Sequence, residues 1–121
     1  MRIVSFDSGA AVAERVVDFK TRLAKEDPRL IPPTRRTEAS YYAAEHPFLR
    51  HGRVKHFVVE SGAGKVLGAV SAAIDDQQPG DVGLVGLYQS VNDQAVANLL
   101  LGAARAHLAA AGKRVMKVIM K

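Results

Sequence analysis

The sequence contains no cysteine and no tryptophan. Without cysteine the protein can form neither a disulfide bond nor a thiolate zinc site, and it has no cysteine nucleophile. No apolar run approaches the roughly 18 residues of a membrane span, and the N-terminal residues lack the long apolar core of a signal peptide. We therefore expect a cytoplasmic protein that does not enter the membrane.

Aromatic residues are also scarce, with four phenylalanines and three tyrosines in 121 residues. Lys and Arg number 17 against 12 Asp and Glu, a formal net charge of +5. The basic residues are spread along the chain, whereas a protein that binds single-stranded nucleic acid places stacking rings among its cations. A nucleic-acid-binding module is thus supported by charge alone. The length and the 48% apolar content indicate one globular domain over residues 1–121.

The N-terminal part predicts a strand and a helix. Residues 2–6 have the pattern of a short strand, and Asp7 or Ser8 offers a side-chain oxygen that can cap a following helix. Apolar residues then recur at spacings of four, three and four, which places them on one helical face that can dock on a sheet. This stripe consists of Val12, Val16, Phe19 and Leu23.

A proline-rich segment and a second helix are expected next. Residues 27–36 contain three prolines, which excludes regular structure. Residues 37–45 have the composition of a capping box followed by alanines and tyrosines, so we expect a short helix that Pro47 ends. Tyr41 and Tyr42 would point to different sides of this helix, with one of them in the core.

The second half predicts three strands, a long helix and a last strand. Two glycines in residues 62–65 indicate a hairpin between the first two strands. Asn92 can cap the long helix, and Gly112 can end it. The strands are expected at 54–61, 66–74, 82–88 and 114–120. The apolar face of the helix would comprise Val96, Leu99, Leu100, Ala103, Ala104 and Leu108.

The element order β-α-α-β-β-β-α-β predicts an α+β fold, with a mixed, mostly antiparallel sheet and helices on both faces. The last strand follows a crossover helix, so it should lie parallel to the third meander strand. This order resembles the fold of the GNAT family of N-acetyltransferases. The segments that carry the resemblance are DPRLIPP at 27–33, HPFLRH at 46–51, KVLGAVSAAIDD at 65–76 and VGLVGLYQSVNDQAVANLLLGAARAHL at 82–108.

The resemblance implies that acetyl-CoA or another acyl-CoA binds where the fourth and fifth strands diverge. Its pantetheine arm would pair with the fourth strand, and its pyrophosphate would lie at the N-terminus of the following helix. The family motif at this turn has Gln or Arg at its first position, Gly at its fourth and Gly or Ala at its sixth. Asn92, Ala95 and Ala97 stand at these three positions, and only the last matches. The implied cofactor-binding residues are Leu87, Tyr88, Gln89, Asn92, Ala95, Val96 and Ala97.

Apart from the family resemblance, the residues of this turn indicate how well it can bind an anion. A helix N-terminus favours an anion through its free N–H groups and the helix dipole. No glycine lets a pyrophosphate approach the backbone closely here, and Asp93 puts a negative charge where the anion would lie. The sequence therefore predicts a degenerate cofactor motif.

Candidate catalytic residues are His46, His51 and Tyr88. The two histidines flank Phe48 in the loop before the second strand, and in a GNAT-like fold this loop would face the acceptor. Tyr88 carries a hydroxyl group on the fourth strand. The spacing of five between His46, His51 and His56 matches neither a helical nor a strand metal pair, so we expect no metal site.

The family continues beyond the fifth strand with a helix and two strands, and that helix commonly supplies a tyrosine that protonates the leaving thiolate. This chain ends at Lys121, so the resemblance implies a fold without these elements. One reading is an acyl-CoA N-acyltransferase-like domain. The other is a non-catalytic GNAT-like protein that self-associates through its last strand, and its uncovered edge and apolar face lead us to expect a homo-oligomer.

Overall fold

The computed structural model describes residues 1–27, 29, 39–77 and 80–118. These residues form a five-stranded sheet whose strand order follows the sequence. The first four strands are antiparallel, and the fifth is parallel to the fourth. The strands are β1 (Arg2–Asp7), β2 (Gly52–Glu60), β3 (Val66–Asp75), β4 (Val82–Ser90) and β5 (Val115–Val118). The predicted α+β fold with a mixed, mostly antiparallel sheet is confirmed.

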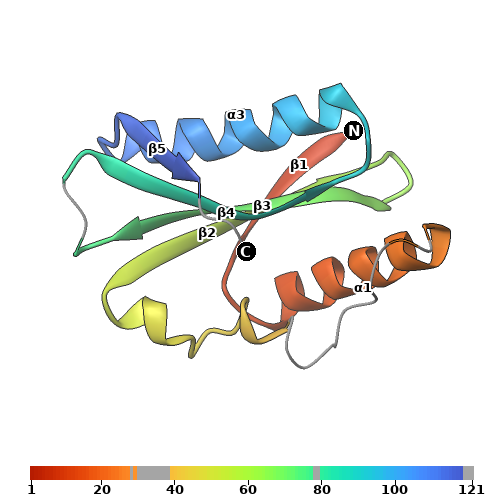
Figure 1. Cartoon of the computed structure of the whole chain (residues 1–121), viewed down its shortest axis with the longest axis horizontal. Coiled ribbons are helices and arrows are strands. Elements are labelled where there is room, and N and C mark those ends of the chain that lie inside the picture. The colour runs from red at the N-terminus through yellow and green to blue at the C-terminus, as the bar shows by residue number, and fades with distance from the viewer. Residues whose placement is uncertain (28, 30–38, 78–79, 119–121) are drawn as a thin grey trace.

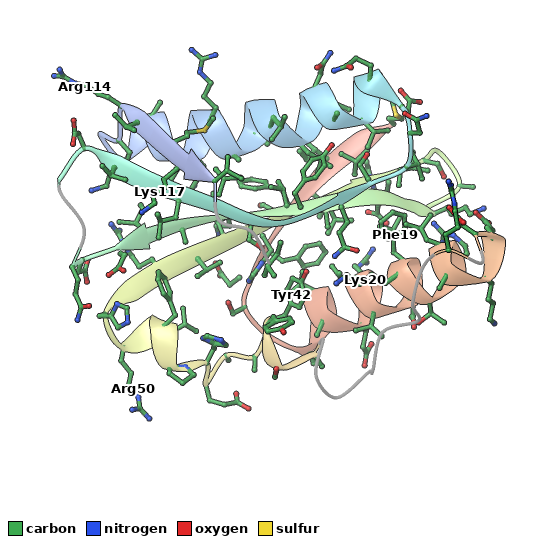
Figure 2. The ribbon with its side chains drawn as sticks, viewed as in Figure 1. Phe19, Lys20, Tyr42, Arg50, Arg114 and Lys117 are labelled. Atoms are coloured by element: carbon green, nitrogen blue, oxygen red, sulfur yellow. The ribbon has the colours of Figure 1, made fainter. Side chains whose placement is uncertain are left out.

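Two long helices cover the two faces of this sheet. Helix α1 (Ala10–Glu26) lies on one face and α3 (Gln94–Ala110) lies on the other (Figure 1). The predicted stripe of α1 faces the sheet: three of its members are fully buried, and Leu23 packs beside them. Phe19 lies between α1 and the sheet, as does Tyr42 from the segment that follows (Figure 2).

Helix α3 touches the sheet along a narrower line than we predicted. Its buried residues are Val96, Leu100, Ala104 and Leu108. Leu99 is 38% exposed, so its assignment to the buried face is wrong. Glycines beneath the helix explain the narrow contact: a Cβ at Gly68 would lie 2.8 Å from Leu100 Cδ1, and one at Gly83 would lie 2.7 Å from Leu108 Cδ2. The helix therefore lies close to the backbone of the sheet.

Strand alternation divides the core into two clusters. Val58 faces α1 and Val59 faces α3, because successive side chains of a strand point to opposite faces. Buried Glu60 ties α1 to the sheet, since its carboxylate accepts a hydrogen bond from Arg15 Nη1 at 2.8 Å. Arg22 of α1 also donates to the Val66 carbonyl at the start of β3.

The helix predicted over residues 37–45 is wrong at residues 41–45, which form turns. Residues 37 and 38 lie outside the described residues. The Tyr42 carbonyl accepts the Gly9 N–H at 2.6 Å, and the N–H groups of Tyr42 and His46 bond three residues back instead of four. Contact with the start of α1 thus replaces a helical hydrogen bond. A 3-10 helix, η1 (Pro47–Arg50), begins at the proline that we expected to end the helix.

Other local predictions concern tyrosines and turns. Tyr42 is buried and Tyr41 is 36% exposed, which confirms that one of them belongs to the core. The hairpin at 62–65 is confirmed, as is the end of α3 before Gly112, which has a left-handed φ of +81°. The proline-rich segment lies largely outside the described residues. None of the helices in the described ranges is long and apolar enough to span a membrane.

Candidate functional site

Strand β4 contains a β-bulge in its second half. Ser71 of β3 pairs with Gly86 and Ala69 pairs with Gln89, so two residues of β4 lie opposite a single residue of β3. One of them, Leu87, has a φ of +53°. This left-handed conformation costs a non-glycine residue about 1–2 kcal/mol. Because strained backbone of this kind concentrates at functional sites, the bulge is a candidate site.

The outer edge of β4 is open beside the bulge. β5 pairs only with residues 82–85 of β4. Within the described part of the chain, no strand pairs with the outer side of residues 86–90. Leu87, Tyr88 and Gln89 therefore lie on a free strand edge, and an extended ligand can pair with such an edge through main-chain hydrogen bonds. Tyr88 is 42% exposed there and does not line the neighbouring cavity described below.

Asp93 caps helix α3, so our expectation that Asn92 caps it is wrong. The helix begins at Gln94, and the Asp93 carboxylate accepts the Ala95 N–H at 2.8 Å. The Asp93 carbonyl accepts the Ala97 N–H at 3.1 Å. The carboxylate thus uses an N–H group that a phosphate would otherwise find at the helix N-terminus, and it adds a negative charge there.

The remaining turn positions differ in what they can offer a ligand. Asn92 and Ala95 are exposed, and Ala97 is half-buried. The Val96 side chain is fully buried between α3 and the sheet, so only its backbone can face the turn. The strand edge can therefore pair with an extended ligand, whereas the helix N-terminus is poorly suited to an anion.

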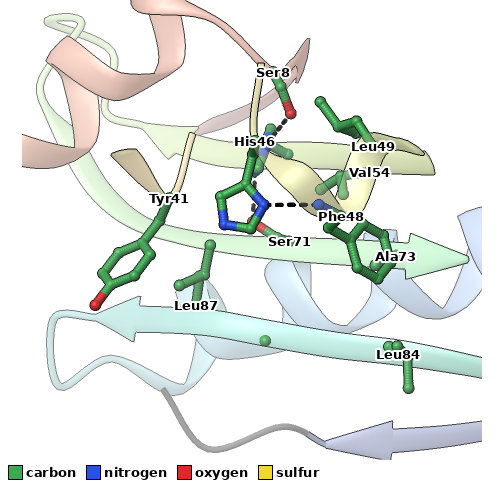
Figure 3. Close-up of a pocket in the computed structure, with 12 residues that line it drawn as sticks. Ser8, Tyr41, His46, Phe48, Leu49, Val54, Ser71, Ala73, Leu84 and Leu87 are labelled. Atoms are coloured by element: carbon green, nitrogen blue, oxygen red, sulfur yellow. Dashed lines mark hydrogen bonds between the residues drawn. The ribbon is translucent and has the colours of Figure 1, made fainter. Parts of the chain in front are cut away.

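A cavity lies on the α1 side of the sheet, next to the bulge. Its volume is about 110 Å³, and it lies between the sheet and the segment around η1 (Figure 3). The lining residues are Ser8, Tyr41, His46, Phe48, Leu49, Val54, His56, Ser71, Ala73, Leu84, Gly86 and Leu87. Gly86 and Leu87 also belong to the β4 edge, so the cavity reaches the place where that edge is open.

His56 lies in the wall of this cavity between two serine hydroxyls. Its Nε2 is 3.0 Å from Ser8 Oγ, and its Nδ1 is 2.6 Å from Ser71 Oγ. The ring is 1% exposed. Burial lowers the pKa of His56 to about 4, although the negative charge of Asp7 opposes the shift. The ring is therefore neutral at physiological pH, with one N–H donor and one acceptor nitrogen.

His46 also lines the cavity, as a hydrogen-bond donor. Its Nδ1 accepts the Phe48 backbone N–H at 3.1 Å, which caps η1 (Figure 3). Because that lone pair is used, the neutral ring carries its proton on Nε2. The geometry thus argues against the general-base role that we considered for His46.

His51 does not line the cavity, although its ring contacts Phe48, which does. His51 Nδ1 is 2.9 Å from Asp75 Oδ1, and the ring packs edge-on against Phe48. Asp75 is four residues along β3 from Ser71, about 13 Å at a rise of 3.3 Å per residue. The pKa of Asp75 is lowered by the Gln77 N–H and then by the His51 hydrogen bond. No cluster of three or more metal-ligating side chains occurs among the described residues.

Sequence reasoning missed the Ser8–His56–Ser71 group. Alternation along β2 does place His56 on the same face as Val54 and Val58, so a histidine within an apolar strand was a signal for this face. Its serine partners come from other parts of the chain, Ser71 from β3 and Ser8 from the residue that follows β1. Only the pairing of β2 with β3 and the position of Ser8 after β1 bring the three side chains together.

The strand order of the sheet and its two helices are those of a GNAT-like fold, and solved structures agree. A tandem GNAT protein from the clavulanic acid biosynthesis pathway, without AcCoA, aligns with a TM-score of 0.73 at 18% identity. The alignment covers 97% of this chain and 35% of that protein. This chain thus spans about a third of its length.

Two further structures with the same fold contain the coenzyme. An aminoglycoside 6'-N-acetyltransferase complexed with coenzyme A has a TM-score of 0.64 at 12% identity, covering 98% of this chain and 61% of that one. A predicted acetyltransferase from Clostridium acetobutylicum with acetyl-CoA has a TM-score of 0.64 at 9% identity, covering 98% and 80%. No protein-family model and no curated protein matches the sequence. Identities this low show the fold alone.

Proposed function

We propose that this chain is an acyl-CoA-binding domain of the N-acyltransferase type. One observation carries the proposal: Gly86 and Leu87 belong both to the open edge of β4 and to the wall of the cavity. An extended arm paired with that edge would bring its end to the cavity, where a second substrate can lie beside it. Two proteins with a similar fold contain coenzyme A or acetyl-CoA, which supports this reading.

The same residues limit what the domain can do. Asp93 opposes an anion at the α3 N-terminus, so we infer weak binding of the coenzyme. The described residues that line the cavity include no carboxylate. An ammonium substrate would therefore meet no anionic base there, and general-base catalysis typically contributes 10²–10⁴-fold to such a reaction. We infer slow acyl transfer to cationic amines.

A titration with coenzyme A tests this proposal. Calorimetry would give the Kd, and amide shifts in a ¹⁵N–¹H NMR spectrum should change at residues 86–90 and 92–97. Ala95→Glu adds a negative charge at the α3 N-terminus and should weaken binding severalfold. Ala106→Glu, at another exposed position of α3, is the matched control and should leave the Kd unchanged. The absence of amide shifts at millimolar coenzyme A would refute the proposal.

A second candidate function is self-association through β5. This strand is at the edge of the described sheet, and its Val115, Met116 and Val118 are 49%, 38% and 66% exposed. An exposed strand edge with apolar side chains is a template for pairing with another copy. Sedimentation velocity should show a dimer at micromolar concentration. Val118→Lys should dissociate it, while Leu101→Lys, at an exposed apolar position of α3, should not. A monomer of the unmodified chain would contradict this candidate.

A further inference from the structure

The cavity presents a polar group in an otherwise mostly apolar wall. The apolar lining includes the rings of Tyr41 and Phe48 and the side chains of Val54, Ala73 and Leu84. The polar lining belongs to the Ser8–His56–Ser71 group and to His46. A ligand that fills this space therefore needs an apolar body and at least one hydrogen-bonding group.

Ser8 can bind that hydrogen-bonding group. A hydroxyl offers one donor and two acceptor lone pairs, and Ser8 Oγ makes one side-chain hydrogen bond within the described residues, to His56 Nε2. If Ser8 donates to His56, its lone pairs can accept an N–H from a ligand. If His56 donates instead, the Ser8 hydroxyl hydrogen is available to a ligand. Ser8 thus retains hydrogen-bonding capacity with either tautomer of His56.

The cavity does not suit a cation. None of its described lining residues is Asp, Glu, Lys or Arg, and His56 is neutral at physiological pH. Asp7 and Lys55, whose charges act on His56, pair with each other at 2.8 Å. Moving an ammonium group from water into such a site without an anionic partner is strongly unfavourable. The electrostatics therefore select an uncharged ligand.

The size of the cavity corresponds to a single ring. Its volume of about 110 Å³ is somewhat below the roughly 150 Å³ of an apolar cavity known to bind benzene. It is also partly open to solvent, so a ring can enter with one edge exposed. The tyrosine and phenylalanine rings of the lining favour edge-on or offset contact with an aromatic ligand.

We propose that this cavity binds a small, uncharged aromatic amine, with its ring against the apolar wall and its amino group at Ser8. As an acyl acceptor this amine would be the second substrate, so the inference rests on the proposed function in that respect. An aromatic amine is only weakly basic and carries no proton at neutral pH. Acyl transfer would join this nitrogen to the acyl carbon and break the C–S bond of the thioester, and the released thiolate can take up the proton that the nitrogen loses. The reaction therefore does not require a carboxylate base, in agreement with the lining of the cavity.

Binding of 4-methylaniline by the whole chain, without coenzyme A, tests this inference. The probe should shift the amides of Ala73, Gly86 and Leu87 in the NMR spectrum. The cationic 4-methylbenzylamine has a similar ring and should bind at least about tenfold more weakly, because its charge must be desolvated. Equal binding of the two amines, or no binding of 4-methylaniline at millimolar concentration, would overturn the inference.

Two variants and a control locate the probe. Ser8→Ala should weaken binding about 2- to 10-fold, the usual effect of one hydrogen bond. Ala73→Leu fills the cavity and should abolish binding. Ser5→Ala is the control, because Ser5 pairs with Phe57 and lies on the other face of the sheet. Binding that neither Ser8→Ala nor Ala73→Leu changes would overturn the inference.

The coenzyme titration separates this inference from the proposed function. If 4-methylaniline binds in the cavity while coenzyme A shifts no amide at 86–97, the acyl-CoA proposal fails and the ligand class stands. If coenzyme A binds and the neutral amine does not, the inference of an aromatic-amine ligand is refuted and the acyl-CoA proposal stands.

Discussion

The carboxylate of Asp93 accepts a hydrogen bond from the backbone N–H of Ala95 at 2.8 Å. This contact fixes the start of α3 and places a negative charge at its N-terminus. Asp93→Asn removes the charge, and asparagine caps a helix about as well as aspartate. We expect coenzyme A to bind more tightly by about 0.3–1 kcal/mol, the usual strength of a charge at a helix end. Calorimetry measures the change. Asp76→Asn, in the turn after β3, should have no effect, and an unchanged Kd for Asp93→Asn would place the phosphates elsewhere.

Gly68 should not tolerate a side chain. A Cβ there would lie 2.8 Å from Leu100 Cδ1 and 2.9 Å from the Gln89 carbonyl oxygen, which belongs to the paired strand and cannot move freely. We expect Gly68→Ala to lower the free energy of unfolding by about 1–3 kcal/mol, as overpacking usually does. Urea denaturation measures this. Gly62→Ala is the control, because nothing lies within 4 Å of a Cβ at that position. Equal effects of the two substitutions would show that α3 is not packed this closely.

Stability should fall as the pH decreases from about 6.5 to 4. His56 has a pKa of about 4 in the folded protein and an ordinary value of 6.5, so the unfolded chain binds the proton first. The shift corresponds to about 3 kcal/mol, present above pH 6.5 and lost by pH 4. The Tyr42 ring packs against His56, and the charges of Asp7 and Lys55 act on it in opposite directions.

Urea denaturation at several pH values measures that loss, and His56→Gln should abolish most of it. Burial also lowers the pKa of His107, so His107→Gln is the control for a smaller contribution in the same direction. The pKa of Asp75 is lowered from 3.8, so its contribution to stability is lost only below the pH range in which His56 acts. A pH dependence that survives in His56→Gln would contradict this assignment.

The ion pair of Arg15 with buried Glu60 should matter more than that of Arg2. Arg15 Nη1 lies 2.8 Å from the carboxylate with its side chain 42% exposed, and Arg2 Nη2 lies 3.5 Å away with its side chain 73% exposed. We expect Arg15→Met to lower the free energy of unfolding by about 1–3 kcal/mol, because it leaves a buried carboxylate less satisfied. Arg2→Met should cost less than about 1 kcal/mol. Thermal and urea unfolding of both variants measure the difference, and an equal loss would show that Glu60 does not depend on Arg15.

Acyl transfer to aliphatic amines should be close to the uncatalysed rate at neutral pH. Such amines are protonated, and the described cavity residues provide no anionic base to take up the proton. Release of free thiol from acetyl-CoA over a panel of amines measures the rate. Fast turnover of aliphatic amines that His46→Ala abolishes would contradict the donor role of His46 and identify it as the base.

The sequence by itself determined the order of the five strands and the two long helices, and it determined which face of α1 is buried. Val12, Val16 and Phe19 recur at helical spacing and are apolar, so burial against a sheet follows from periodicity alone. The hairpin at 62–65 and the helix end at Gly112 follow from the freedom of glycine to adopt left-handed backbone. These features depend on neighbours within about one turn or hairpin, and local sequence is sufficient to specify them.

Tertiary structure decided the site. Pairing continued outward from the hairpin contact of Glu60 with Val66 would set Val70 opposite His56, but a register shift between Val59 and Glu60 brings Ser71 there instead. A one-residue shift exchanges the faces of a strand, so the shift decides whether the histidine meets a hydroxyl or an apolar side chain. The left-handed Leu87 and the turns at 41–45 likewise depend on contacts between segments distant in sequence. Local propensity does not encode such contacts, because their free energy exists only once the sheet and helices have packed.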